Sequence, residues 1–176
     1  MTNQNIVLPS IALRGTTILP GMIVHFDVSR ERSIKAIEAA MLHDQKIFLV
    51  THKDPEVETP DASGVYQVGT IAYIKQVVKL PQNLLRVLVE GIGRGLLVKF
   101  EQEFPFLRSE ITPVDEESIQ MPEALMEAMH RSLKELFHRY CMENGKISKE
   151  LVTQILNIEQ IEELVEQIAV NLPLSY

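Results

Sequence analysis

Three glycines at alternate positions form the pattern in this sequence that most resembles a site of chemistry. Gly91, Gly93 and Gly95 lie in VEGIGRGLLVKF, between two apolar runs. Glycines that follow a strand can hold a phosphate when they open a helix, as in G-x-G-x-x-G. The spacing here is G-x-G-x-G, the residues that follow favour a strand, and no G-K-[ST] occurs. The glycines therefore predict a bulge or bend between two strands, and Gly91 is expected to adopt a backbone conformation that β-branched residues avoid.

The single cysteine, Cys141, is the remaining candidate for nucleophilic or metal chemistry. His138 precedes it by three positions, so both side chains can share one face of a helix. Two ligands are too few for a structural zinc site. The sequence contains no H-E-x-x-H, C-x-x-C or G-x-S-x-G motif. It therefore predicts no catalytic residue and no metal site, with Cys141 packed in a helical core.

The composition predicts a globular protein of a reducing compartment. The 176 residues, 45% hydrophobic and 23% charged, suffice for one ordinary domain or two small ones. One cysteine excludes an internal disulfide framework and favours the cytoplasm. No apolar run approaches the roughly 18 residues of a membrane span, and the N-terminus lacks a signal-peptide pattern. A membrane partner is therefore not expected.

The net charge of −7 is unevenly placed along the chain. Residues 1–115 carry 12 basic and 13 acidic side chains, and residues 116–176 carry 5 and 11. Binding to duplex nucleic acid needs a basic footprint, and binding to single strands needs aromatic stacking surfaces. Aromatic residues make up only 6% of the chain. Both observations argue against a nucleic-acid partner.

The sequence changes character near residue 115, which predicts a β-rich subdomain of residues 1–115. Short apolar runs are separated there by glycine and proline, and MIVHFDV alternates apolar and polar residues. Two β-rich runs flank PQN, which is a hairpin signal. Ser29 is expected to be the N-cap of one amphipathic helix, with Ile34, Ile37, Ala40 and Met41 on its apolar side.

Residues 116–176 predict a helical subdomain, because their apolar residues recur at spacings of three and four. Three helices are expected. Gly145 is the expected end of the first and Ser148 the expected N-cap of the second. The fold class is therefore α+β, with a β-rich unit followed by a helical one.

The stretch TTILPGMIV is the first candidate binding surface. It is apolar and interrupted by Pro20 and Gly21, so we expect Ile18, Leu19 and Met22 to be partly exposed. The alternative interpretation places these side chains under a neighbouring strand.

The stretch SRERS is the second candidate. Arg30, Glu31 and Arg32 follow one another at the predicted helix start, where basic residues oppose the helix dipole. Usually such a run is a solvated face, but it also favours an acidic partner. The candidate binding residues are thus Ile18, Leu19, Pro20, Met22, Arg30, Glu31 and Arg32.

The N-terminal third of the chain resembles the opening of the ATP-dependent Lon proteases. The matching elements are Leu8-Pro9, Leu13-Arg14-Gly15, Pro20-Gly21-Met22 and Arg30-Glu31-Arg32-Ser33. Further matches are KIFLVTHKDPEVETP, VGTIAYIKQVVKLP, LRVLVEGIGRG and NLPL. The resemblance covers essentially the whole chain and is to the family's N-terminal domain. Within the glycine run, Gly91 and Arg94 are the family-like positions.

The resemblance implies a PUA-like β pseudo-barrel with one helix, followed by a three-helix bundle. It also implies a non-catalytic domain that recognises unfolded or damaged protein substrates and supports assembly of a hexamer. In the family, an ATPase module that uses ATP and Mg²⁺ and a Ser-Lys protease module follow this domain. The chain is therefore expected to be a fragment of a longer cytoplasmic protein, without a cofactor of its own.

Two alternatives remain at this point. A stand-alone PUA-like module would bind RNA or protein, although the balanced charge of residues 1–115 argues against RNA. A small enzyme would use Cys141 or the histidines, and no motif supports it.

Overall fold

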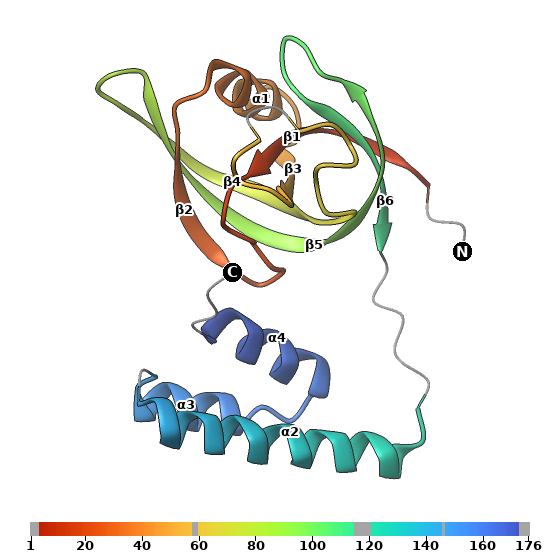
Figure 1. Cartoon of the computed structure of the whole chain (residues 1–176), viewed down its shortest axis with the longest axis vertical. Coiled ribbons are helices and arrows are strands. Elements are labelled where there is room, and N and C mark those ends of the chain that lie inside the picture. Colours follow the sequence, from red (N-terminus) through yellow and green to blue (C-terminus); the bar gives the residue numbers. More distant parts are fainter. Residues whose placement is uncertain (1–3, 58–59, 115–120, 146, 173–176) are drawn as a thin grey trace. The chain divides into compact units, whose positions relative to one another are not determined.

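The computed structural model describes residues 4–57, 60–114, 121–145 and 147–172. The chain divides into two compact units, Met1–Asp115 and Glu116–Tyr176. Each unit has its own buried apolar core. The first unit contains the strands and α1, and the second contains the remaining helices (Figure 1).

Within its described residues, the first unit is a six-stranded sheet with one helix. Its elements are β1 (Ile6–Leu13), β2 (Ile23–Val28), α1 (Glu31–Met41), β3 (Lys46–Thr51), β4 (Val68–Leu80), β5 (Leu84–Gln102) and β6 (Arg108–Val114). The strand order is β2-β5-β4-β3-β1-β6, and β5 also pairs with β6, which closes the sheet into a barrel (Figure 1). β1 and β3 are parallel, and all other pairs are antiparallel.

The alternation in MIVHFDV places one face of β2 inward, as predicted. Val24 and Phe26 are half-buried against the core, and Val28 is buried. Ile23 on the other face is 63% exposed. This orientation gives the first unit an apolar wall beside the start of α1.

Helix α1 begins at Glu31, so the prediction that Ser29 is its N-cap is wrong. The N-cap is Arg30, which has an extended backbone and forms no side-chain cap hydrogen bond. Val28 still pairs with Leu85, and the chain stays extended through Arg30 before it turns into the helix. The buried face consists of Ile34, Ala36, Ile37 and Ala40. Met41, expected on that face, is 39% exposed.

The predicted hairpin around PQN joins β4 to β5, and Gln82 and Asn83 take positive φ angles in its turn. β5 then runs for 19 residues through all three glycines, so the expected break into two strands is wrong. Its register with β4 shifts between Ile71 and Ala72, whose partners are Gly93 and Gly91. Ile92 is therefore the extra residue of a β-bulge, as the glycines indicated.

Gly91 is required for a close approach of two backbones and not for an unusual φ. The described glycines with positive φ are Gly15, Gly21 and Gly145, so the expected conformation at Gly91 is wrong. A Cβ at Gly91 would collide with the carbonyl oxygen of Leu19. The Gly91 N–H also donates to the Met22 carbonyl oxygen at 2.9 Å. The glycine thus holds the segment between β1 and β2 against β5.

The second unit consists, within its described residues, of α2 (Glu123–Asn144), α3 (Lys149–Leu156) and α4 (Ile161–Asn171). Its core contains Phe137, Cys141, Ile155, Leu164 and Ile168. The caps predicted at Gly145 and Ser148 are confirmed. Gly145 ends α2 in the left-handed conformation, and the Ser148 hydroxyl accepts a hydrogen bond from the Leu151 N–H at 3.3 Å. None of the helices in the described ranges combines the length and apolar character needed to cross a membrane.

Candidate binding site at the start of helix α1

Two neighbouring hollows lie beside the N-terminal end of α1, and residues of the first unit alone form both. The first, the arginine pocket, has a volume of about 400 Å³. Its lining residues are Ser10, Ile11, Ala12, Arg30, Glu31, Arg32, Ser33, His52, Pro60 and Leu107. The second, the β2 hollow, has a volume of about 490 Å³ and shares Ile11, Ala12, Arg30 and Ser33 with the first.

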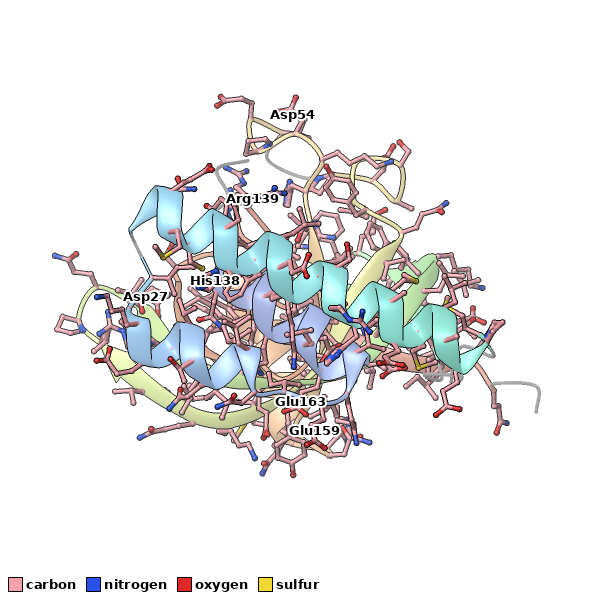
Figure 2. All side chains as sticks on the ribbon, turned by 90° about the horizontal axis from the view of Figure 1, so that it is seen from below. Asp27, Asp54, His138, Arg139, Glu159 and Glu163 are labelled. Carbon is pink, nitrogen blue, oxygen red and sulfur yellow. The ribbon has the colours of Figure 1, made fainter. Side chains whose placement is uncertain are left out.

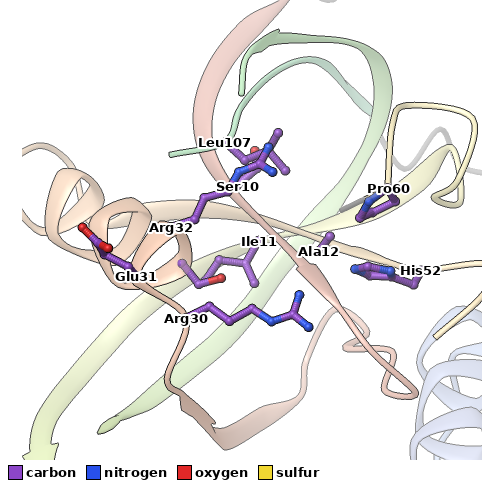
Figure 3. Close-up of a pocket in the computed structure, with 10 residues that line it drawn as sticks. Ser10, Ile11, Ala12, Arg30, Glu31, Arg32, His52, Pro60 and Leu107 are labelled. Atoms are coloured by element: carbon purple, nitrogen blue, oxygen red, sulfur yellow. The ribbon is translucent and has the colours of Figure 1, made fainter. Parts of the chain in front are cut away.

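Strand β1 and the first turn of α1 form the walls of the arginine pocket (Figure 3). Arg30 extends from the helix start toward the His52 side of the pocket, and Arg32 extends toward Ser10 (Figure 3). Glu31 points away from these arginines (Figure 3). It pairs with Lys35 at 2.6 Å, and the hydrogen bond from Lys35 lowers the pKa of the Glu31 carboxyl. The positive side chains therefore dominate the interior of the pocket.

His52 closes the pocket at the end of β3 and is only 4% exposed. Its backbone is fixed by a hydrogen bond from its N–H to the Leu13 carbonyl oxygen at 2.9 Å. Burial lowers the pKa of its imidazole and the positive charges of Arg14 and Arg30 lower it further, while nearby backbone groups of Asp54 and Ala12 raise it in part. The net shift is downward and favours the neutral ring. Its Nδ1 atom is buried and has no hydrogen-bond partner among the described residues.

Arg32 is held over an aromatic ring at the opposite side of the pocket. Its guanidinium carbon lies 5.3 Å from the ring centroid of Phe104, which is 76% exposed. A guanidinium over an aromatic face is attracted by the ring quadrupole. The Nε atom of Arg32 is buried without a hydrogen-bond partner in the described part of the chain. The arginine is thus positioned by its stacking contact and keeps a donor unused.

The β2 hollow has an apolar wall and a charged rim. The wall comes from Ile18, Met22, Val24 and Phe26. At the rim, Asp27 accepts hydrogen bonds from Nε and Nη2 of Arg86 at 2.7 and 2.8 Å, and this pairing lowers the pKa of the Asp27 carboxyl. One edge of β2 pairs with β5 along its whole length, and no described strand pairs with the other edge.

The structure separates the seven candidate binding residues into three groups. Arg30, Glu31 and Arg32 line the arginine pocket, and Ile18 and Met22 line the β2 hollow. Leu19 and Pro20 line neither and instead lie against Gly91.

The expected exposure of Ile18 is wrong, since only 3% of this residue is exposed. Its carbonyl oxygen accepts a hydrogen bond from the hydroxyl of Thr70 at 2.5 Å, which ties the segment to β4. Pro20 is also buried, and Leu19 and Met22 are half-buried. The alternative interpretation, in which the segment packs under its neighbours, therefore holds for Ile18.

Sequence reasoning did not single out His52, which lines the arginine pocket, or Phe104, which contacts Arg32. A polar residue at the end of the buried run KIFLVTH was the available signal for His52. Phe104 reaches Arg32 across 72 positions of sequence, and no local pattern indicates such a contact.

The nucleophile candidate is packed away from solvent. Cys141 is buried in the helical core, and burial raises the pKa of its thiol. Cysteine reacts as the thiolate, so this environment makes it inert. His138 is exposed on α2 (Figure 2). In the described residues, no three or more His, Cys, Asp or Glu side chains are grouped to hold a metal ion.

Comparison with known proteins supports the resemblance seen in the sequence. The family model for the "ATP-dependent protease La (LON) substrate-binding domain" matches residues 7–176. The Lon protease of Lachnoclostridium phytofermentans is 45% identical over 168 residues, which are 96% of this chain and 21% of that protein. Lon protease 1 of Bacillus subtilis is 36% identical over 168 residues, which are again 96% of this chain and 21% of that protein. The chain thus spans about a fifth of the length of the curated relatives it matches.

Two solved structures share the fold. The N-terminal domain of the Mycobacterium avium complex Lon protease matches with a TM-score of 0.61 at 17% identity, over 95% of this chain and 100% of that one. The Lon N-terminal domain protein from Xanthomonas campestris matches with a TM-score of 0.57 at 14% identity. The match covers 96% of this chain and 99% of that one. The predicted α+β fold, with one helix in the β-rich unit and three helices after it, is confirmed.

Proposed function

The chain belongs to the family of Lon protease substrate-binding domains, and from this premise we propose that it captures unfolded or damaged protein through the β2 hollow. The proposal is carried by one observation. An apolar wall of four side chains lies beside an edge of β2 with which no described strand pairs.

This arrangement suits an unfolded chain for two physical reasons. Apolar side chains that a folded protein would bury gain free energy by leaving water for the wall of Ile18, Met22, Val24 and Phe26. An extended segment can also pair its backbone with an unpaired strand edge. The hydrogen bonds of this pairing come from the main chain, so they depend little on the sequence of the bound segment. Low sequence selectivity is what recognition of damaged proteins requires.

We further propose that the domain works in several copies as part of a larger assembly. A hollow of about 490 Å³ accepts only a few side chains, so one copy binds weakly. Several copies in a hexamer would raise the effective affinity without a new contact. Assembly of that hexamer is the second role we propose for the domain.

The catalytic steps belong, in this proposal, to the rest of a longer cytoplasmic protein. Cys141 is not suited to act as the nucleophile, because it is buried and burial raises the pKa of its thiol. ATP, Mg²⁺ and the serine and lysine of a peptidase would act in the four fifths of such a longer protein that this chain does not span. The isolated domain should therefore bind an unfolded protein without hydrolysing ATP or cutting peptide bonds.

The test measures binding of fluorescein-labelled, reduced and carboxymethylated α-lactalbumin to the chain by fluorescence anisotropy. Met22→Glu places a charge on the apolar wall and should weaken binding about tenfold, with Val24→Thr as a milder second change. Leu42→Glu is the matched control, since Leu42 is 83% exposed at the end of α1 and lines neither hollow. Equal binding by the Met22, Val24 and Leu42 variants, with thermal unfolding unchanged, would contradict the proposed role of the β2 hollow.

A further inference from the structure

We propose that the arginine pocket binds a carboxylate, either the C-terminal carboxylate or an acidic side chain of the protein that lies in the β2 hollow. The source of the carboxylate rests on the function proposed above. The carboxylate site itself stands on four observations on the pocket.

The first observation is the uncapped start of α1. The earliest hydrogen bond within this 11-residue helix runs from the Ile34 N–H to the Arg30 carbonyl oxygen at 2.9 Å. The N–H groups of Glu31, Arg32 and Ser33 precede that bond and have no carbonyl partner within the helix. Arg30 at the N-cap forms no side-chain cap hydrogen bond. These donors and the positive end of the helix dipole favour an anion at this place.

The second observation is a pair of unused polar atoms in the walls. His52, 4% exposed, presents an Nδ1 atom without a partner among the described residues, and Arg32 presents its Nε–H in the same condition. Leaving a buried donor unsatisfied destabilises the fold, so such atoms indicate a missing partner. A carboxylate offers several acceptor positions, and the Nε–H of Arg32 and the helix N–H groups are donors that it would satisfy.

The third observation is the grouping of cationic side chains at the pocket. Arg30 and Arg32 line the pocket, and Arg14 lies close enough to act on His52. Glu31, the acidic side chain among the described lining residues, is already paired with Lys35. The first unit as a whole has nearly balanced charge. Cationic side chains are therefore grouped at this pocket, although the charge of the whole unit is nearly balanced.

The fourth observation separates a carboxylate from a phosphate or a nucleic acid. Ile11, Ala12, Pro60 and Leu107 give the pocket an apolar wall beside its cations. A carboxylate on an alkyl stem meets both surfaces, whereas inorganic phosphate is hydrated on all sides. The residues shared with the β2 hollow allow a chain that occupies the hollow to place its carboxylate in the pocket.

The first experiment uses small probes, so that it does not depend on capture of unfolded protein. N-acetyl-leucine and N-acetyl-leucinamide are titrated into the chain, and the ¹H–¹³C NMR signals of the His52 ring are followed. We expect N-acetyl-leucine to shift these signals with an affinity at least about tenfold higher than the amide, because only the acid offers a charge-assisted acceptor.

The second experiment tests the donors. Arg32→Gln removes the guanidinium and should weaken N-acetyl-leucine binding about tenfold, with little change for the amide. Arg139→Gln is the matched control, because Arg139 is exposed on α2 and the net charge changes equally (Figure 2). Its affinity should equal that of the unchanged chain.

A third comparison identifies the source of the carboxylate. Three peptides share one apolar sequence and end in a free carboxylate, an amide, or an amide preceded by an internal glutamate. If only the peptide with the free carboxylate binds more tightly than the amidated peptide, the site takes a chain terminus. If the amidated peptide with the internal glutamate also binds more tightly, the site takes acidic side chains.

The outcomes separate this proposal from the proposed function. Equal affinity for acid and amide probes, or displacement of N-acetyl-leucine by inorganic phosphate at lower concentration than by acetate, overturns the carboxylate site and leaves capture at the β2 hollow intact. If Arg32→Gln weakens N-acetyl-leucine binding as expected but the unchanged chain does not bind unfolded α-lactalbumin, the result supports the carboxylate site and contradicts the proposed function.

Discussion

The imidazole of His52 resists protonation because its surroundings disfavour a positive charge. The ring is buried at the end of β3, and Arg14 and Arg30 act on it from the neighbouring segments. Both burial and these cations lower its pKa below the ordinary value of 6.5. The folded chain therefore binds fewer protons at this position than the unfolded chain.

This difference predicts how stability changes with pH. Below about pH 6.5, His52 becomes protonated in the unfolded chain but stays neutral in the folded chain. The free energy of unfolding should therefore fall as the pH drops from 6.5 toward the lower pKa of His52 in the folded state. Urea denaturation at a series of pH values measures the slope. His52→Gln should flatten this part of the slope. Equal slopes in the two proteins would show that His52 does not titrate differently in the folded and unfolded states.

Single residues were predictable where their role depends on the next few positions. Ser148 and Gly145 act as the predicted caps because capping is decided within one helical turn. Ile18 was not predictable, since the Thr70 hydroxyl that ties down its backbone comes from 52 positions away. His52 and Arg32 belong to the same category, because the sequence does not show what surrounds them.

Strand β5 pairs with more strands of the first unit than its neighbours do. Its first half pairs with β2, its second half with β6, and most of its length with β4. The bulge at Ile92 lies between these halves, where Gly91 admits the backbone of Leu19. The strand thereby positions the segment that leads into the β2 hollow.

Replacing the glycines one at a time separates close approach from simple flexibility. Gly91→Ala should lower the free energy of unfolding by about 1–3 kcal/mol, because the new Cβ collides with a backbone oxygen that cannot rotate away. Gly93→Ala is the matched control: a Cβ there meets no atom within 4 Å, and the change should stay within about 0.5 kcal/mol. Guanidinium denaturation measures both. A tolerated alanine at 91 would show that the two backbones separate at little cost.

The presence of each helix and strand was easier to predict than its first and last residues. The hairpin at PQN, the alternation in β2 and the three later helices follow from local periodicity and turn residues. The continuity of β5 did not, because alternate glycines weaken a strand locally and only pairing with β4 and β6 keeps it extended. The start of α1 shifted for a similar reason, since β2 holds the chain extended through Val28.

At the scale of the whole molecule, each unit has a separate core. Ile37, Ile74 and Val87 belong to the core under α1, and Phe137 and Leu164 to the helical core. A separate core is what allows a unit to fold alone. The boundary between the units falls where the sequence changes from short, glycine- and proline-punctuated apolar runs to helical spacing, near residue 115.

Separate cores predict separate unfolding. Leu164→Ala, at a fully buried position, should lower the stability of the helical unit by about 2–5 kcal/mol and raise amide hydrogen exchange in α2, α3 and α4 alone. Ile74→Ala should do the converse in the first unit. Mass spectrometry of exchanged peptides distinguishes the two. Loss of protection in both units from either change would mean that they unfold as one cooperative body.

The pairing of β1 with β6 sets when the first unit can form during synthesis. Ile6 pairs with Ile111 and Leu8 with Ser109, so the first described strand of the unit cannot complete its pairing until the last one, β6, has been synthesised. Closing so long a loop slows folding. Until then, β1 and β3 remain apolar and incompletely paired on the nascent chain, where they are open to aggregation. A nascent domain proposed to recognise unfolded chains thus passes through the state that its finished form would recognise.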